Sequence, residues 1–339
     1  MKCNLDKNKS WQHALTNAIT EPSELIKLLE LDEALIPKAH LAAITFPLKV
    51  PRGFVARMKK GDVNDPLLQQ VLPLAAELET HAGYETDPLR EKQFNPIPGL
   101  LHKYPSRVLL TPIGACGINC RYCFRRHFAY EDNNPGSAGW EKAIDYIAKD
   151  PAISEVILSG GDPLVANDST LASLTQKLIH IPHIKRLRIH TRMLIVLPER
   201  ITEELITAIT HPTIKTILVT HCNHPQEINS EVVLAAQKLK KAGVILLNQT
   251  VLLKGINDHV DILAALSEAL FSADILPYYL HILDKVQGAA HFDLALQTAR
   301  TLHQGLIERL SGYLVPKLVC EQPGAPAKVS MTGLEFCTE

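Results

Sequence analysis

Three cysteines close together in the sequence are the residues with the clearest chemical potential. Cys116, Cys120 and Cys123 form a Cys-x₃-Cys-x₂-Cys pattern, so one loop can supply three soft thiolate ligands. A four-iron cluster is normally held by four cysteine thiolates. With three local ligands, one iron would keep an open position that could chelate the amino and carboxylate groups of S-adenosylmethionine (SAM). The pattern therefore predicts a [4Fe–4S] cluster beside SAM, where one-electron transfer would cleave a carbon–sulfur bond and give a 5′-deoxyadenosyl radical.

Two further features agree with this interpretation. Tyr122 directly precedes the third cysteine, as in radical SAM enzymes. Gly160, Gly161 and Asp162 follow a short apolar run further along the chain, and a glycine pair lets the backbone approach a ligand closely. We expect these three residues to contribute to SAM binding.

A zinc site is the alternative for the same loop. His127 would be the fourth ligand in a Cys-x₃-Cys-x₂-Cys-x₃-His pattern. Structural zinc sites prefer two Cys-x₂₋₄-Cys pairs from separate places in the chain, and the second pair is missing here. The pattern therefore favours the iron–sulfur cluster.

The elements that must position this loop alternate between strands and helices. Six apolar runs are separated by amphipathic, helix-like segments at a spacing of about 30 residues, which is typical of a parallel sheet with helical crossovers. The runs are 107–113, 155–160, 186–191, 214–221, 243–253 and 276–284. Polar residues end every run, and contributions from all six favour a barrel rim over the single crevice of a doubly wound sheet. We predict an α/β fold: a partial (βα)₆ barrel of the radical SAM type with an N-terminal helical extension.

The part of the chain before these runs has a different pattern. Residues 1–95 read as mainly helical and irregular, with prolines that interrupt longer helices, and they carry no metal or phosphate motif. We expect two regions: an N-terminal helical region, 1–95, for packing and as a lid, and the barrel with its C-terminal segment, 96–339.

Composition limits the classes of partner. The chain has 339 residues and a formal net charge of −1, so its overall charge does not favour nucleic acid or anionic membranes. No apolar run approaches the roughly 20 residues needed to cross a bilayer, and the polar N-terminus lacks the core of a signal peptide. Seven cysteines, three of them clustered, do not suggest a disulfide framework. We expect a cytoplasmic protein that binds neither nucleic acid nor membranes.

Several separated motifs resemble those of the lysine 2,3-aminomutase family. They are LHKYPSRVLL, CRYCFRRHF, SGGDPL, RIHTR, LLNQTVLL, PYYLHILDKVQGAAHF and SGYLVPKL. The likeness extends over about residues 85–330 and is greatest to the shorter bacterial branch, which makes (R)-β-lysine for attachment to elongation factor P. The family also uses pyridoxal 5′-phosphate (PLP), because a shift of an amino group between neighbouring carbons requires a radical beside an imine.

The resemblance implies roles for individual residues. The lysine that carries PLP would be Lys328 in PGAPAK, a segment that is less glycine-rich than in the larger enzymes. The PLP phosphate would lie near Lys103, Tyr104 and Arg107, and SAM would contact Gln249. Arg125 would bind the substrate carboxylate. Asp284 and Glu321 would bind the ε-ammonium group of lysine, with Glu321 standing where the family has an aspartate.

The resemblance also implies an activity and its partners. The reaction would be the isomerisation of L-lysine to β-lysine by 2,3-amino migration, with electrons from a reductant protein such as flavodoxin or ferredoxin. The product would supply elongation factor P through a separate ligase. Two other classes remain open: a radical SAM enzyme without PLP, and a non-catalytic iron–sulfur or zinc protein.

Overall fold

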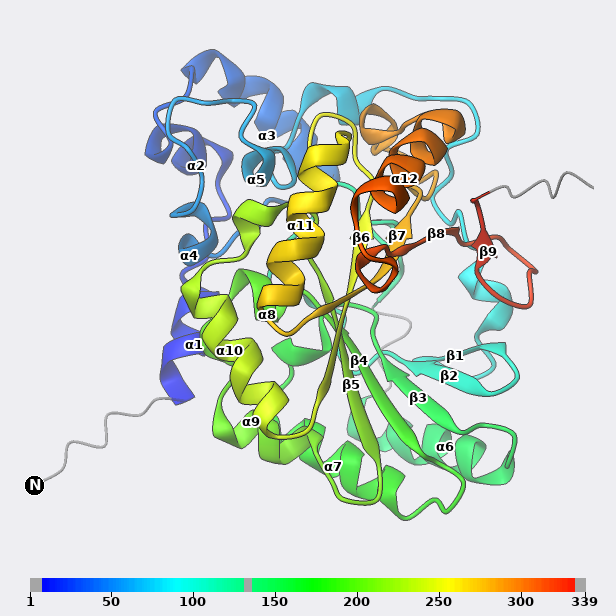
Figure 1. The fold of residues 1–339 in the computed structure, drawn as a ribbon. Coiled ribbons are helices and arrows are strands. Elements are labelled where there is room, and N and C mark those ends of the chain that lie inside the picture. The colour runs from blue at the N-terminus through cyan, green and yellow to red at the C-terminus, as the bar shows by residue number, and fades with distance from the viewer. Residues whose placement is uncertain (1–7, 131–135, 333–339) are drawn as a thin grey trace, which may run out of the picture.

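A single mixed sheet forms the centre of the molecule (Figure 1). The computed structural model describes residues 8–130 and 136–332. Within them, nine strands pair in chain order; neighbouring strands from β2 through β8 run parallel, and β1 and β9 pair antiparallel at the two edges. The strands are β1 (Leu100–Tyr104), β2 (Arg107–Leu110), β3 (Glu155–Leu158), β4 (Arg186–Thr191), β5 (Lys215–His221), β6 (Ile245–Val251), β7 (Leu276–His281), β8 (Lys317–Cys320) and β9 (Val329–Ser330).

The predicted fold class is confirmed. Each of the six apolar runs contains one strand, from β2 to β7, and the pairing order ends at β1 and β9 without joining them, so the barrel is open. The edge strands β1 and β9, and β8 beside β9, were not among the predicted units. They add a hairpin before the first unit and a short strand pair after the sixth.

The crossover helices lie along the outside of the curved sheet (Figure 1). They bury one apolar face each, as α7 does with Leu171, Leu174 and Leu178 at helical spacing. None of the helices in the described ranges is long and apolar enough to cross a bilayer. The helices of this part are α6 (Gly136–Lys149), α7 (Asp168–Ile179), α8 (Met193–Val196), α9 (Glu203–Ile209), α10 (Ser230–Lys241), α11 (Val260–Ser272) and α12 (Leu296–Arg309), with 3₁₀ turns η4 (Pro163–Val165), η5 (Pro198–Arg200), η6 (Pro225–Glu227), η7 (Ala290–Phe292) and η8 (Gly312–Leu314).

The alternation of side chains along the strands separates the core from the inner face. In β4, Leu187 and Ile189 are buried in the hydrophobic core, whereas Arg188 and His190 line a cavity on the other face. Gln249 and Val251 of β6 face the same cavity, two residues apart. The period of two therefore delivers polar side chains to one space inside the sheet.

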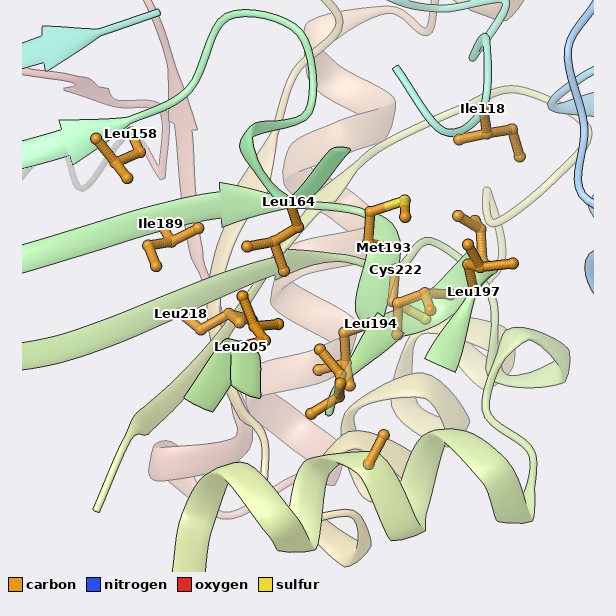
Figure 2. Close-up of a cluster of buried hydrophobic side chains, with 14 of the residues drawn as sticks. Ile118, Leu158, Leu164, Ile189, Met193, Leu194, Leu197, Leu205, Leu218 and Cys222 are labelled. Carbon is orange, nitrogen blue, oxygen red and sulfur yellow. The ribbon is translucent and has the colours of Figure 1, made fainter. Parts of the chain in front are cut away.

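The hydrophobic core continues beneath the cysteine loop (Figure 2). Ile118, between the first two cysteines, is buried in the same cluster as Met193 and Leu194 of α8. A methyl group added at Gly117 would lie 2.3 Å from the Met193 sulfur, so a larger residue here would displace the Met193 side chain. The cysteine loop thus rests on packed side chains rather than on solvent.

The N-terminal helices contribute to this same core. Trp11, Phe54 and Leu68 are buried in one cluster with residues of the barrel. The predicted boundary near residue 95 falls between η3 and β1, but the division into two domains stays a prediction. The N-terminal elements are α1 (Asn8–Thr16), α2 (Pro22–Leu28), η1 (Glu33–Leu35), α3 (Ile36–Thr45), α4 (Arg52–Val55), α5 (Pro66–Gln69), η2 (Ala75–Leu78) and η3 (Glu91–Phe94).

Candidate active site

One cavity of about 720 Å³ lies on the inner face of the sheet. Its walls come from the loops after β2 and β3, from the inner faces of β4 to β7, and from the N-terminal and C-terminal segments. All of the site residues predicted from the sequence line this cavity: Lys103, Tyr104, Arg107, Cys116, Cys120, Cys123, Arg125, Gly160, Gly161, Asp162, Gln249, Asp284, Glu321 and Lys328. The fold therefore brings together residues that are far apart in the sequence.

The three cysteines form the sulfur-rich end of the cavity. All three are free and partly buried, and Sγ of Cys120 accepts a hydrogen bond of 2.7 Å from Nη1 of Arg192. Burial, and then the neighbouring Cys123, raises the pKa of Cys116 well above its usual value, and burial with Cys120 raises the pKa of Cys123 to about 11. Thiols of this kind become thiolates when a metal replaces the proton. Three soft sulfur donors from one loop fit an iron–sulfur cluster.

His127, the fourth ligand of the zinc alternative, lies elsewhere. Its side chain is exposed, and its Nε2 is 3.2 Å from the carbonyl oxygen of Gln287. It is not among the residues that line the cavity with the cysteines.

The glycine pair brings the loop after β3 against the cysteine loop. A methyl group at Gly161 would lie 2.5 Å from the carbonyl oxygen of Ala115, and one at Gly160 would lie 2.3 Å from Cγ2 of Thr111. Gly160 also has a φ of +103°, which only glycine adopts readily. The close approach of these two backbones shapes the cavity wall on which a ligand would lie.

Asp162 has a structural task in addition to its predicted one. Its buried carboxylate accepts hydrogen bonds from the Thr191 hydroxyl at 2.6 Å and from the main-chain N–H groups of Arg192 and Leu164 at 2.7 and 3.0 Å. Burial raises its pKa, although these hydrogen bonds oppose the shift. Asp162 therefore ties the ends of β3 and β4 together at the cavity wall.

The cavity also holds Lys328 in a cluster of charged groups. Glu321 accepts hydrogen bonds from Nζ of Lys328 at 2.6 Å, from Nζ of Lys103 at 2.7 Å and from the Tyr104 hydroxyl. Burial alone would raise the pKa of Glu321, but Lys328, Lys103 and Tyr104 lower it to about 2. The guanidinium of Arg107 lies over the Tyr104 ring at 4.2 Å. A primary amine and an arginine on one wall are the groups that PLP requires for its aldehyde and its phosphate.

Two histidines, His281 buried and His190 half-buried, offer further contacts to a ligand. Nε2 of His190 and Nε2 of His281 have no hydrogen-bond partner among the described residues, and both side chains line the cavity. Burial, and then nearby cations, lowers the pKa of His190 well below its usual range and that of His281 to about 3. Both rings are therefore neutral, and each can donate or accept one hydrogen bond toward a bound molecule. The sequence placed His190 at a strand end without giving it a role.

Arg125 and Asp284, two of the three predicted substrate-binding residues, differ in their surroundings. Arg125 forms a bidentate pair with Glu91, through Nε at 2.8 Å and Nη2 at 2.6 Å, and donates from Nη1 to the Ser159 hydroxyl at 3.1 Å. Asp284 lines the cavity with Lys328, and burial raises its pKa to about 7 although Lys328 opposes the shift. Glu91 was missed in the sequence because it lies in the N-terminal region, which carries no motif.

Gln249 also has a partner within the cavity wall. Its Nε2 lies 2.7 Å from Nε2 of His221, on the neighbouring strand β5. The contact fixes the amide beside the two histidines His190 and His221, whose rings meet edge to face at 6.0 Å.

Comparison with known proteins defines first the class and then the family. Residues 110–266 match the family model described as the Radical SAM superfamily, in agreement with the open barrel and the three-cysteine loop. The chain is 48% identical over 329 residues to an L-lysine 2,3-aminomutase of Escherichia coli, covering 97% of this chain and 96% of that protein. It is 48% identical over 322 residues to the L-lysine 2,3-aminomutase of Haemophilus influenzae, covering 95% of each. The longer L-lysine 2,3-aminomutase of Clostridium subterminale is 38% identical over 321 residues, which are 94% of this chain and 76% of that protein. The chain belongs to the L-lysine 2,3-aminomutase family.

Proposed function

We propose that this protein is a radical SAM isomerase that converts L-lysine to β-lysine by moving the amino group from C2 to C3. The observation that carries the proposal is that one cavity contains both the three-cysteine loop and Lys328, which lie far apart in the sequence. The names of relatives that are 48% identical over nearly the whole chain support the same reaction.

The cavity residues would hold three cofactors. Cys116, Cys120 and Cys123 would ligate a [4Fe–4S] cluster, and the Gly160–Gly161 wall would lie against SAM. Nζ of Lys328 would hold PLP, with Arg107 toward its phosphate. When bound, the cluster and SAM supply a radical that removes a hydrogen atom, and PLP carries the migrating nitrogen.

The charged groups at the PLP end suit a substrate with a second amine. Glu321 already accepts hydrogen bonds from two ammonium groups, those of Lys103 and Lys328, so its geometry suits the ε-ammonium of lysine. Asp284 lies on the same cavity wall and adds a second carboxylate. Arg125 would bind the carboxylate at the other end. A substrate held at both ends has its Cβ at a fixed place, which is the positioning that lowers such barriers most.

Stereochemistry and biological partners complete the proposal. The product would be (R)-β-lysine, and a separate ligase would attach it to elongation factor P in the cytosol. A small one-electron reductant protein, such as flavodoxin or ferredoxin, would reduce the cluster. Chiral chromatography of the product, and the mass of elongation factor P in cells lacking this protein, test these two points.

The direct test of the reaction uses reconstituted protein under anaerobic conditions. Incubation with L-lysine, SAM and dithionite should give β-lysine, resolved from α-lysine by chromatography. The same preparation should contain about four irons per chain. One zinc per chain, or no β-isomer from protein loaded with cluster and PLP, would contradict the proposal.

A single substitution separates the aminomutase from a radical SAM enzyme without PLP. Lys328→Ala should remove the visible absorbance of PLP attached to a lysine and abolish β-lysine formation, while the iron content stays unchanged. Lys317→Ala, at an exposed lysine on β8, is the matched control and should change neither. Full activity in Lys328→Ala would favour the PLP-free alternative.

A further inference from the structure

A buried arginine touches one of the candidate cluster ligands directly. Arg192 follows β4, and its side chain is only 4% exposed. Its Nη1 donates a hydrogen bond of 2.7 Å to Sγ of Cys120, and it lines the cavity beside the cysteine loop. In the sequence it is the last residue of the motif RIHTR, which gives it no role of its own.

Several elements fix the guanidinium in this position. Nη2 donates to Oε1 of Gln70 at 2.5 Å and to Oε2 of Glu227 at 3.1 Å. The main-chain N–H of Arg192 donates to Asp162 at 2.7 Å. Gln70 also donates to Glu227 at 3.0 Å, so the two partners are themselves linked. An arginine held at both ends cannot turn away from the sulfur without breaking this network.

We propose that Arg192 raises the reduction potential of the cluster, and that Gln70 of the N-terminal region holds it in place to do so. The inference rests on the proposed function, because it takes Cys120 to be a cluster ligand. Reduction adds one electron, from an external one-electron reductant, to a cluster that three thiolates already make negative. A charged N–H donor at a ligand sulfur stabilises that added electron, and hydrogen bonds to sulfur are a recognised control of such potentials.

The nearby carboxylate does not cancel this effect. Glu227 balances the charge of Arg192 over longer distances, but the N–H group that faces Cys120 is the positive end of the pair. Arg192 is thus a positioning residue that acts through the cysteine, and it transfers neither a proton nor an electron. A purely structural arginine would change stability but leave the potential unchanged.

The test measures the cluster rather than the reaction. Reconstituted proteins are poised at one fixed potential with dithionite and mediators, and the reduced cluster is quantified by electron paramagnetic resonance. Iron and sulfide contents and thermal midpoints are recorded for every protein. The variants are Arg192→Lys, Gln70→Leu and a double variant that combines Arg192→Met with Glu227→Gln. The double variant avoids leaving an unpaired buried charge. Arg200→Lys is the control, because Arg200 is equally buried and paired with Asp168 but does not line the cavity.

We expect the double variant to lower the ratio of reduced to oxidised cluster at least tenfold, which is about 59 mV for a one-electron couple. Arg192→Lys and Gln70→Leu should lower it less, and Arg200→Lys should leave it unchanged. If neither Arg192 variant retains a cluster, the ratio of reduced to oxidised cluster in Gln70→Leu tests the inference. An unchanged ratio in the loaded variants overturns the inference alone. Wild-type protein without a four-iron cluster overturns both the inference and the proposed function.

Discussion

At the scale of single residues, Asp284 and Glu321 line one cavity, but their pKa values are shifted in opposite directions. Lys328 and Lys103 hold the pKa of Glu321 down to about 2, whereas burial raises that of Asp284 to about 7. Glu321 is therefore ionised at any physiological pH, and Asp284 changes its charge near neutrality. If both bind the ε-ammonium of lysine, only one of them makes that binding depend on pH.

We therefore predict that the KM for L-lysine rises as the pH falls from 8 to 6, approaching about tenfold per pH unit below the pKa of Asp284. Asp284→Asn should raise KM at pH 8 and remove the dependence of KM on pH. Glu321→Gln should also raise KM, but KM should still depend on pH. Steady-state kinetics of the fully loaded enzyme measure both. A wild-type slope that persists in Asp284→Asn would assign the titration to another group.

The same pKa has a consequence for stability. A carboxyl whose pKa is raised in the folded chain stabilises the fold below its unfolded pKa of 3.8, and this contribution is lost as the pH rises through 7. Asp284→Asn should therefore have a higher thermal midpoint than the wild type at pH 8, with a smaller difference at pH 5. The comparison needs only thermal unfolding of the protein without substrate.

Gly161 provides a test of the contact between the two loops that shape the cavity. Gly161→Ala would push a methyl group against the backbone of Gly114 and Ala115, which cannot move without displacing the cysteine loop. We expect a loss of about 1–3 kcal/mol in the free energy of unfolding and a lower iron content after reconstitution. Gly53→Ala, where a methyl group meets nothing within 4 Å, is the control and should be close to neutral. Full iron loading of Gly161→Ala would show that this contact does not position the cysteines.

At the scale of elements, the short 3₁₀ turn η3 reaches from the N-terminal region to the predicted substrate carboxylate site. Glu91 of this turn pairs with two nitrogens of Arg125, and Ser159 takes a third. The pair fixes the plane of the guanidinium and neutralises its charge. A bound substrate carboxylate would meet the N–H groups that remain.

Glu91→Gln should therefore separate affinity from turnover. Arg125 would keep an uncompensated charge, so KM for L-lysine should fall or stay unchanged, while kcat should fall severalfold because the fork is less well fixed. Glu85→Gln, at an exposed carboxylate on the same segment, is the control. A rise in KM with unchanged kcat would argue that Glu91 itself faces the substrate.

The elements also explain what the sequence could and could not predict. Strands β2 to β7 were predictable because each is an apolar run followed by a helix, and parallel strands deliver their ends to one rim. The edge strand β9, Val329–Ser330, has only two residues, too few for a period to appear. The site residues could be predicted from the sequence because they follow strands or match family motifs. Glu91 and Gln70 were missed because they pair with Arg125 and Arg192 only in the folded chain. Such tertiary contacts leave no pattern in the sequence.

At the scale of the whole molecule, a buried ion cluster joins the N-terminal region to the barrel. Glu77 of η2 accepts hydrogen bonds from Arg121 and Arg126 of the cysteine loop, and the side chains of Glu77 and Arg121 are fully buried. Arg126 also donates to the carbonyl oxygen of Gly288, beyond β7. Three parts of the chain therefore depend on one carboxylate.

Removing this carboxylate would leave two buried guanidinium groups without their partner. We predict that Glu77→Ala lowers the free energy of unfolding by about 3–5 kcal/mol. Glu79→Ala, two residues away and exposed, should stay within about 0.5 kcal/mol of the wild type. Denaturant titrations followed by circular dichroism measure both.

The shared core predicts in addition that the N-terminal region and the barrel unfold together. The chain has two tryptophans, and each reports on one part: Trp11 is buried in α1, and Trp140 is buried in α6. Fluorescence of Trp140→Phe then follows the N-terminal region, and that of Trp11→Phe follows the barrel. Because Trp11 packs in the same cluster as barrel residues, each variant should give one transition whose midpoint coincides with that seen by circular dichroism. If the Trp11 signal instead changes at a lower denaturant concentration than the circular dichroism of the same variant, residues 1–95 form a separate domain, and Glu77 joins two units rather than stabilising one.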